Sequence, residues 1–130
     1  MSTRSAIAIQ ETKDGPVRHI YCHFDGYPEH NGKILNEHYR DPAKVKELLA
    51  LGDMSSLDET IDKSVFYHRD RKGRLRINEP ITLKELADED VYDYRYVLKE
   101  HEGEWKWFLA ECVGRIVNLT DLEQALAAGA

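Results

Sequence analysis

The stretch from His19 to Tyr39 constrains this chain most, because it predicts a strand, a sharp turn and a helix in quick succession. Side chains in its first part alternate as they do in a strand with one buried face. The apolar set is Ile20, Cys22 and Phe24. The polar set is His19, Tyr21, His23 and Asp25. Asp25 and Gly26 are typical of a turn, and Pro28 cannot continue a strand ladder. A short helix that begins after Asn31, its expected N-cap, and ends near Arg40 should follow.

The segments on either side of this stretch predict further strands. Residues 6–9 favour a strand that a turn at Lys13-Asp14-Gly15 joins to residues 17–24 as an antiparallel hairpin. Residues 64–68 are rich in β-branched and aromatic side chains and predict another strand. Two more strands, at 92–99 and 105–112, alternate aromatic and polar residues. The turn at 101–104 joins them.

Helix signals complete the predicted fold. Asp41 is an expected N-cap with Pro42 in the first helical position, and Gly52 is placed to end that helix in a left-handed conformation. Thr82 with Glu85, and Thr120 with Glu123, match the capping-box pattern. We therefore expect one α+β domain over residues 1–130, with an antiparallel sheet of about five strands and two or more helices packed on one face.

Charge and hydropathy exclude several partners. The net charge of −6 disfavours direct binding to duplex nucleic acid or to an anionic membrane surface. No stretch has the length of a signal peptide or the roughly 20 apolar residues of a membrane span, so we expect a cytoplasmic protein. Cys22 and Cys112 have no metal-ligand spacing and are expected to be reduced, packed thiols. A basic run at 69–76 stands out as either a solvated loop or a local anion site.

Several short motifs carry a family resemblance. They are Ser2-Thr3-Arg4-Ser5, YCHFDGYP at 21–28, Gly32, Leu35, His38 and Tyr39, ALGD at 50–53, SSL at 55–57 and YHRD at 67–70. Over about the first 70 residues the chain resembles a family of small uncharacterised proteins encoded by bacteriophages and related mobile elements. The resemblance implies a mobile-element accessory protein that acts in the host cell cytoplasm. Antagonists of host defence are common in that class, but the resemblance assigns no role to any residue.

The turn at 25–28 is the candidate ligand site. We expect it to rim a pocket floored by Tyr21 and His23, because strand parity exposes these side chains and Gly26 lets backbone approach closely. Two arginines, one before the first strand and one in the basic run, would meet a negative ligand group. The predicted ligand-binding residues are Arg4, Tyr21, His23, Asp25, Tyr27 and Arg69.

These residues favour a noncatalytic binding protein over an enzyme. None of the familiar phosphate-loop, dinucleotide, zinc-protease or serine-hydrolase motifs is present, and we assign no catalytic residue and no cofactor. No metal is assigned, since His19 and His23 lie about 13 Å apart along an extended strand, too far for one zinc. The expected partner is a small anionic or nucleotide-like ligand or a host defence protein.

Two other functions and one assembly remain open. His23 and Asp25 are an acid and base pair for a small hydrolase. The acidic segment 85–93 and the net charge fit a nucleic-acid mimic. A homodimer is expected, because the aromatic strand faces exceed what short helices cover.

Overall fold

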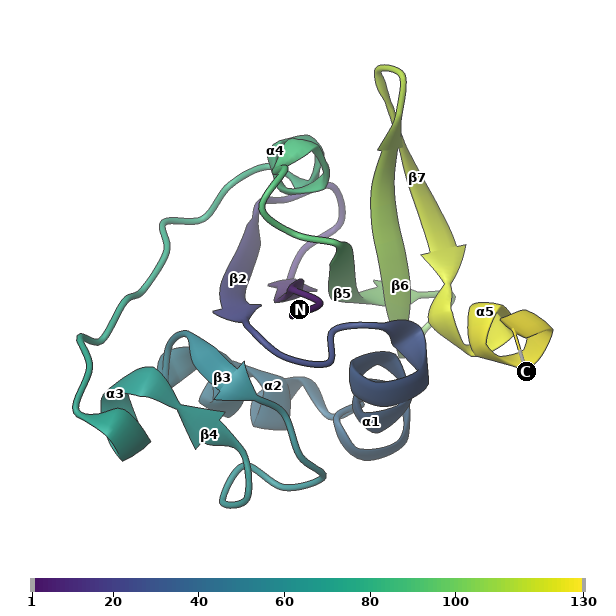
Figure 1. Ribbon diagram of the computed structural model, residues 1–130. Helices are drawn as coiled ribbons and strands as arrows, with labels where there is room; N and C mark the ends of the chain where they lie inside the picture. Colours follow the sequence, from purple (N-terminus) through teal and green to yellow (C-terminus); the bar gives the residue numbers. More distant parts are fainter. Residues whose placement is uncertain (1, 130) are drawn as a thin grey trace.

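Within residues 2–129, which the computed structural model describes, seven strands form one sheet in the order β4-β3-β2-β1-β5-β6-β7 (Figure 1). The strands are β1 (Ser5–Gln10), β2 (Val17–Cys22), β3 (Met54–Ser56), β4 (Val65–Phe66), β5 (Tyr94–His101), β6 (Glu104–Val113) and β7 (Ile116–Asp121). All six residues of β1 are buried, so this strand lies at the centre of the protein.

The sheet is mixed, which corrects the predicted antiparallel sheet of about five strands. β1 pairs antiparallel with β2 but parallel with β5, and β2 pairs parallel with β3. The parallel partners are joined by long connections, so no hairpin signal in the sequence marks them. The prediction also missed β3 and β7. Of the expected strand at 64–68, only Val65–Phe66 is extended, because the backbone then turns into a helix whose Asp70 carboxylate accepts the Phe66 N–H at 2.8 Å.

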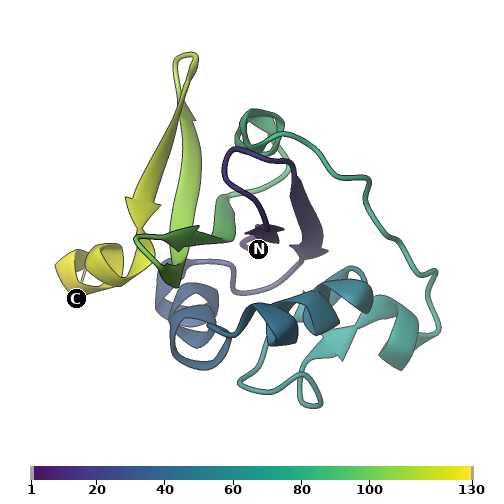
Figure 2. The ribbon, with the colours of Figure 1, turned by 180° about the vertical axis from the view of Figure 1, so that it is seen from behind.

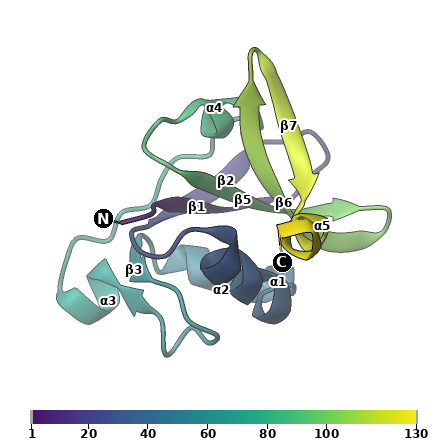
Figure 3. The same cartoon turned by 45° about the vertical axis from the view of Figure 1, so that its right-hand side comes forward.

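Helices cover both faces of the sheet, which corrects the expectation that they pack on one (Figure 3). A five-residue π-helix, η1 (Pro28–Gly32), leads into α1 (Lys33–His38), which α2 (Pro42–Ala50) follows. These helices and α5 (Leu122–Gly129) cover one face. The short α4 (Leu83–Asp88) lies on the other, and α3 (Tyr67–Arg71) follows β4 at the sheet edge. No helix in the described part of the chain is long and apolar enough to cross a membrane.

The face under α1, α2 and α5, which we call the thick face, holds the main core. Large side chains of the central strands meet those of the helices there, and α2 packs against β1 and β2 (Figure 2). The indole N–H of Trp107 donates to the Tyr39 carbonyl at 2.9 Å, which ties β6 to the end of α1. The fully buried members of this core include Ile7, Ile9, Leu35, Tyr39, Val45, Leu48, Tyr96, Leu98, Trp107 and Leu122.

The opposite face, which we call the thin face, has a smaller core. Leu86 of α4 and Tyr92 lie over small side chains from the central strands. The buried residues beneath them are Ala6, Ala8, Val17, Val97 and Ala110. An extended segment at 72–80, which we call the strap, runs from α3 to α4 without regular structure (Figure 1). It is fastened where Asn78 donates to the His19 carbonyl at 3.1 Å and where Ile81 pairs with Val17.

The local signals for helix ends were mostly correct. Asp41 caps α2 by accepting the Ala43 N–H, Gly52 has a φ of +82°, and Thr82 and Glu85 form the predicted capping box. Two caps were wrong. Asn31 lies inside η1 rather than before a helix, and α5 is capped by Asp121, which accepts N–H groups of the helix's first turn, rather than by Thr120.

Candidate functional site

Two backbone hydrogen bonds hold the chain to β3 beyond the end of β2, and this fixes the first part of the candidate site. The N–H of His23 donates to the Met54 carbonyl at 3.1 Å, and that of Phe24 to the Ser55 carbonyl at 2.9 Å. His23 therefore keeps the alternation of the strand and shares the thin face with Tyr21. The alternation ends at Asp25, whose φ of +56° is left-handed. The expected placement of His23 and Asp25 together on one strand face is thus corrected.

Aromatic rings gather where β2 ends. The Tyr21 hydroxyl and Nδ1 of His23 are 2.5 Å apart, a hydrogen bond. The His23 ring meets the edge of Phe24 with centroids 4.5 Å apart, and Tyr21 lies 6.1 Å from Tyr92. Phe24 is 43% exposed, which corrects its assignment to the core, since the strand face that would bury it ends at Cys22. We call Tyr21, His23, Phe24 and Arg4 the exit surface.

Arg4 reaches this surface from the residue before β1. Its backbone is held at both ends, because its N–H donates to the Asp93 carboxylate at 2.9 Å and its carbonyl accepts the N–H of Asp93. Its guanidinium makes no hydrogen bond or ion pair with residues 2–129. Burial raises the pKa of the Tyr21 hydroxyl, and the positive charge of Arg4 opposes that rise. Arg4 thus offers a free cation near Tyr21.

Gly26 fastens the turn to the segment that carries Arg4. Its N–H donates to the Thr3 carbonyl at 2.8 Å, and its carbonyl accepts the Tyr96 hydroxyl at 2.6 Å. A Cβ at this position would lie 2.8 Å from the Ser5 Cβ, so only glycine permits the approach. The predicted need for glycine at this point is explained by backbone packing against the start of β1.

Asn31 was predicted as a helix cap, and its actual contacts give it a different role. It is fully buried, and its Nδ2 donates to the Ser5 hydroxyl and to the Phe24 carbonyl, each at 3.3 Å. It therefore joins β1, η1 and the chain beneath the exit surface. A buried asparagine so close to a turn looks like a cap in sequence, and only the fold distinguishes the two.

Two of the remaining predicted ligand residues, Arg69 and Tyr27, make their contacts with other residues. Arg69 is held in place, because its guanidinium donates to the Ser64 carbonyl at 2.6 Å and the Asp70 carboxylate at 2.8 Å and lies over the Phe66 ring. Its role here is to fasten the connection between β3 and β4. Tyr27 is exposed, with His30 as its aromatic neighbour at 6.2 Å. The structure thus brings Tyr21 and His23 into contact near Arg4, and no such contact joins Asp25, Tyr27 or Arg69 to them.

Acidic residues that the sequence analysis did not select border the exit surface. The Asp53 carboxylate accepts the Tyr21 N–H at 3.0 Å. It takes the place of a backbone acceptor, because the neighbouring strand β3 begins only at Met54. Its charge and that of Glu89 act on His19, whose pKa is nevertheless lowered because the ring is buried. Asp93 lies at the backbone of Arg4. The surface is therefore mixed in charge and not purely cationic.

Three grooves within residues 2–129 lie away from Tyr21 and His23. One of about 450 Å³ is bordered by residues 10–14 and 99–102, and one of about 510 Å³ lies between α1 and α5. A third, of about 350 Å³, is lined by η1, α1 and residues 58–59. None of these three is lined by a predicted ligand residue. The predicted pocket itself stays a prediction, and what is observed at this place is a half-exposed surface.

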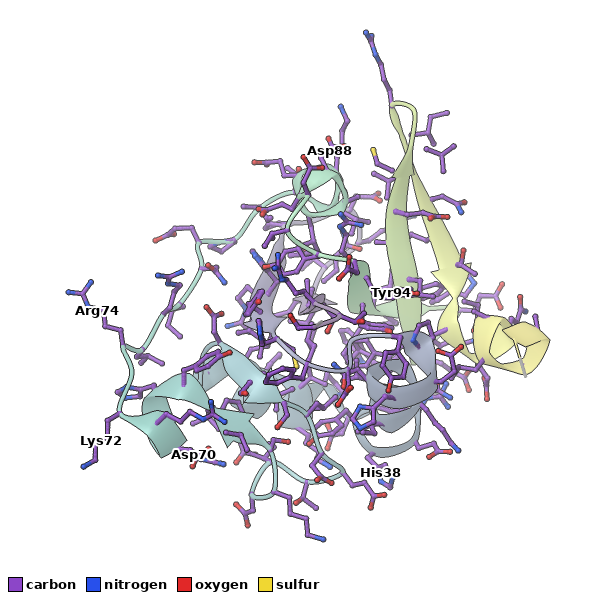
Figure 4. The ribbon with its side chains drawn as sticks, viewed as in Figure 1. His38, Asp70, Lys72, Arg74, Asp88 and Tyr94 are labelled. Carbon is purple, nitrogen blue, oxygen red and sulfur yellow. The ribbon has the colours of Figure 1, made fainter. Side chains whose placement is uncertain are left out.

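The basic run forms a second polar feature. Lys72 and Arg74 extend away from the protein on the strap (Figure 4). Neither they nor Arg71 and Arg76 form an ion pair with another described residue. The guanidinium of Arg71 lies over the Tyr67 ring, 6.0 Å from its centroid. The strap thus presents free positive charge on a protein whose net charge is −6.

No protein-family model matches this chain, and no curated protein or solved structure matches it either. Within residues 2–129 no group of three metal-ligating side chains is gathered in one place. The two cysteines are free thiols, and burial raises the pKa of the Cys22 thiol to about 12, which makes it a poor nucleophile.

Proposed function

We propose that the protein is a noncatalytic binding protein that sequesters a small anionic, nucleotide-like ligand at the exit surface. The observation that carries this proposal is the contact between Tyr21 and His23, together with Arg4, whose guanidinium has no partner in the described chain and which precedes Ser5, the residue that pairs with Cys22. Half-exposed aromatic rings stack on a base of any sequence, and each stack contributes about 1–3 kcal/mol. A free guanidinium beside the rings meets a phosphate.

The carboxylates at the border narrow the ligand class. Asp53 and Asp93 lie beside Tyr21 and Arg4, respectively, and a carboxylate accepts hydrogen bonds from the amino groups of a base. The same negative charges oppose a chain of several phosphates. The expected ligand therefore has one or two bases and few phosphates, as cyclic nucleotides do.

The resemblance to bacteriophage proteins suggests what such binding achieves. A mobile-element protein that withholds a nucleotide signal would antagonise a host defence system without any catalysis. Docking on a host protein is the second route, and the unpaired cations of the strap support it, since they fit an acidic partner surface. The proposal for the exit surface does not depend on the strap.

Calorimetry with a panel of mononucleotides, cyclic nucleotides and cyclic dinucleotides tests the proposal. Phe24→Ala removes a stacking ring and should weaken binding about 5- to 150-fold, the equivalent of about 1–3 kcal/mol. His101→Ala is the matched control, because His101 also packs edge-on against a phenylalanine, Phe108, at 5.7 Å but far along β5. If no nucleotide binds or raises the melting temperature, sequestration is wrong. If both variants lose the same affinity for the nucleotide, the ligand does not bind at the exit surface.

The hydrolase alternative is less well supported. Nδ1 of His23 is occupied by the Tyr21 hydroxyl, and Asp25 lies beyond the end of the strand in a left-handed turn. A base and its orienting acid need hydrogen-bond contact, which favours binding over catalysis here. If a ligand is turned over and His23→Ala abolishes the turnover while binding persists, the hydrolase replaces our proposal.

The acidic mimic is the third function. Within 85–93, the Glu85 carboxylate is tied into the cap of α4, and the basic strap ends shortly before the same segment. Both features weaken a continuous negative surface. Partner binding that does not weaken as salt rises would count against the mimic.

A further inference from the structure

We infer that two copies of this chain associate through the free edges of β7, antiparallel and about a two-fold axis, so that their sheets become continuous. This inference concerns assembly and goes beyond the proposed ligand site, on which it does not rest. The starting observation is that β7 is the last strand of the sheet and pairs only with β6 (Figure 1). Its other side therefore presents unpaired backbone groups, a template for another strand.

The two edges of the sheet differ in how they are protected. β4 is only two residues long, and the register shifts where it pairs with β3, so that edge cannot continue far. β7 has six residues, IVNLTD, in unbroken register with β6. It contains no proline, lysine or bulge, the devices that natural edge strands use against pairing. Its one charged residue, Asp121, is neutralised by Lys106 at 2.6 Å.

The turn between β6 and β7 fixes which backbone groups point outward. Two residues, Gly114 and Arg115, connect the paired positions Val113 and Ile116, and Gly114 has a φ of +66°. Glycine with positive φ at the first turn position is typical of a type II′ hairpin, whose flanking pair exchanges both hydrogen bonds. Backbone groups of Ile116 and Asn118 therefore point to β6. Those of Val117 and Leu119 point away from the sheet.

This parity defines one self-complementary register. Val117 of one copy faces Leu119 of the second copy, and Asn118 faces Asn118 of the second copy at the axis. The backbone N–H and C=O groups that point away from one sheet then meet those that point away from the other. The same register sets Arg115 opposite Asp121 of the second copy, so no like charges lie directly opposite each other in the pairing.

The pairing also covers the most exposed apolar side chains. Ile116 is 73% exposed and Val113 is 60% exposed, and both share a sheet face with Trp107, the face on which α5 lies. In the proposed register Ile116 faces Thr120 of the second copy, just before α5 of that copy begins at residue 122. Each α5 thus reaches the hairpin tip of the other copy, and the second copy is the occupant that explains this exposed tip.

The aromatic strand faces that suggested a dimer from sequence give no support to it. Tyr96 and Trp107 are buried within a single chain by α1, η1 and α5. The inference therefore rests on the β7 edge alone.

Cysteine cross-linking tests the register. In a non-hydrogen-bonded antiparallel pair the Cα atoms are about 4.5 Å apart, within the range of a disulfide. Asn118→Cys in a Cys112→Ser background should therefore give a disulfide-linked dimer under mild oxidation. Thr120→Cys in the same background is the control, because it lies on the same face of the same strand but roughly 13 Å from its copy. Equal cross-linking of the two variants, or none in either, overturns the register.

Sedimentation tests the association itself. The wild-type chain at about 50 μM should sediment at twice the 15.0 kDa mass of the chain. Val117→Pro removes an outward N–H without touching the β6 ladder and should give monomers, whereas Val117→Ala keeps that N–H and should remain dimeric. Far-UV circular dichroism verifies that Val117→Pro is folded. A wild-type protein that stays at 15.0 kDa overturns the inference.

Discussion

The two faces of the central sheet are built from different side chains. On the thick face Ile7 and Ile9 of β1 meet bulky residues of three helices. On the thin face the alternate positions, Ala6 and Ala8, are small, and one short helix covers them. The same strand thus gives its large side chains to one face and its small ones to the other. The thick face supplies most of the buried apolar area and hence most of the stabilising free energy.

The thin face also carries polar chemistry. Oε1 of Gln10 and Nδ1 of His19 are buried there without a hydrogen-bond partner in the described chain. The exit surface lies at the end of the same face, where Tyr21 and His23 are in contact. A face that is thinly covered costs stability, and it leaves polar side chains near solvent where a ligand can reach them.

The sharpest test of this comparison uses two neighbours in β5. Leu98 is buried on the thick face and Val97 on the thin face. Leu98→Ala should lower the free energy of unfolding by about 2–5 kcal/mol, since the large core cannot close the cavity. Val97→Ala removes fewer atoms, and the short helix above it can move to fill the space. The free energy of unfolding should therefore fall less than in Leu98→Ala.

Urea unfolding at one fixed protein concentration measures both variants, because association would add its own free energy. If Val97→Ala lowers the free energy of unfolding as much as Leu98→Ala or more, the thick face does not dominate the stability of the protein.

Much of the local structure follows from single residues and their neighbours. Asp41 with Pro42, Gly52, and Thr82 with Glu85 mark helix ends by chemistry confined to a few residues, and all were correctly predicted. The pairing of β1 with β5 was not predictable in this way. It joins Ser5 to Tyr94 through sheet hydrogen bonds that any two apolar strands can form. β7 was missed because its residues alternate weakly and a capping signal at Thr120 overlaps its end.

The candidate site was predicted only where strand parity holds. Tyr21 and His23 share a face as expected, because the backbone N–H of His23 is still bonded to Met54 of β3. Parity fails at Asp25, where the backbone becomes left-handed. Asp53 was not selected from the sequence. Its carboxylate accepts the Tyr21 N–H because β3 begins too late to supply a backbone acceptor there. Nothing in the local sequence signals such a substitution.

A smaller effect is expected at the cap of α4, the helix that covers the thin face. Thr82→Ala removes the acceptor for the Glu85 N–H, at 3.1 Å, while the backbone N–H of residue 82 can still donate to the Glu85 carboxylate. We expect a loss of about 1 kcal/mol in the free energy of unfolding. Asp41→Ala, the matched change at the start of α2, removes a single bond at 2.9 Å and should cost no more.

Hydrogen exchange distinguishes the two caps. Thr82→Ala should speed exchange at Leu86 and across the thin face without affecting α2, whereas Asp41→Ala should act on α2 alone. Uniform acceleration in both variants would mean that the faces open together and would contradict their separate roles.

The smallest expected effect is a dependence of stability on pH that originates at His19. Burial lowers the pKa of this imidazole in the folded protein below its ordinary value of 6.5, although the charges of Glu89 and Asp53 oppose the shift. Above pH 6.5 the ring is neutral in both states, and the full stability is present. As the pH falls from 6.5 toward the folded pKa, the unfolded chain binds a proton that the folded protein refuses, so the free energy of unfolding decreases.

His19→Gln should remove that decline between pH 7 and pH 5, a window above the range in which most carboxylates titrate. The hydrogen bond from Asn78 goes to the backbone carbonyl of residue 19, so it survives the substitution and the strap stays fastened. His101→Gln, at an exposed histidine, should leave the decline in place. Urea midpoints measured at half-unit pH steps for the three proteins decide the matter. If stability still declines with pH in His19→Gln, another group binds the proton on unfolding. His19 would then not lower the stability of the thin face.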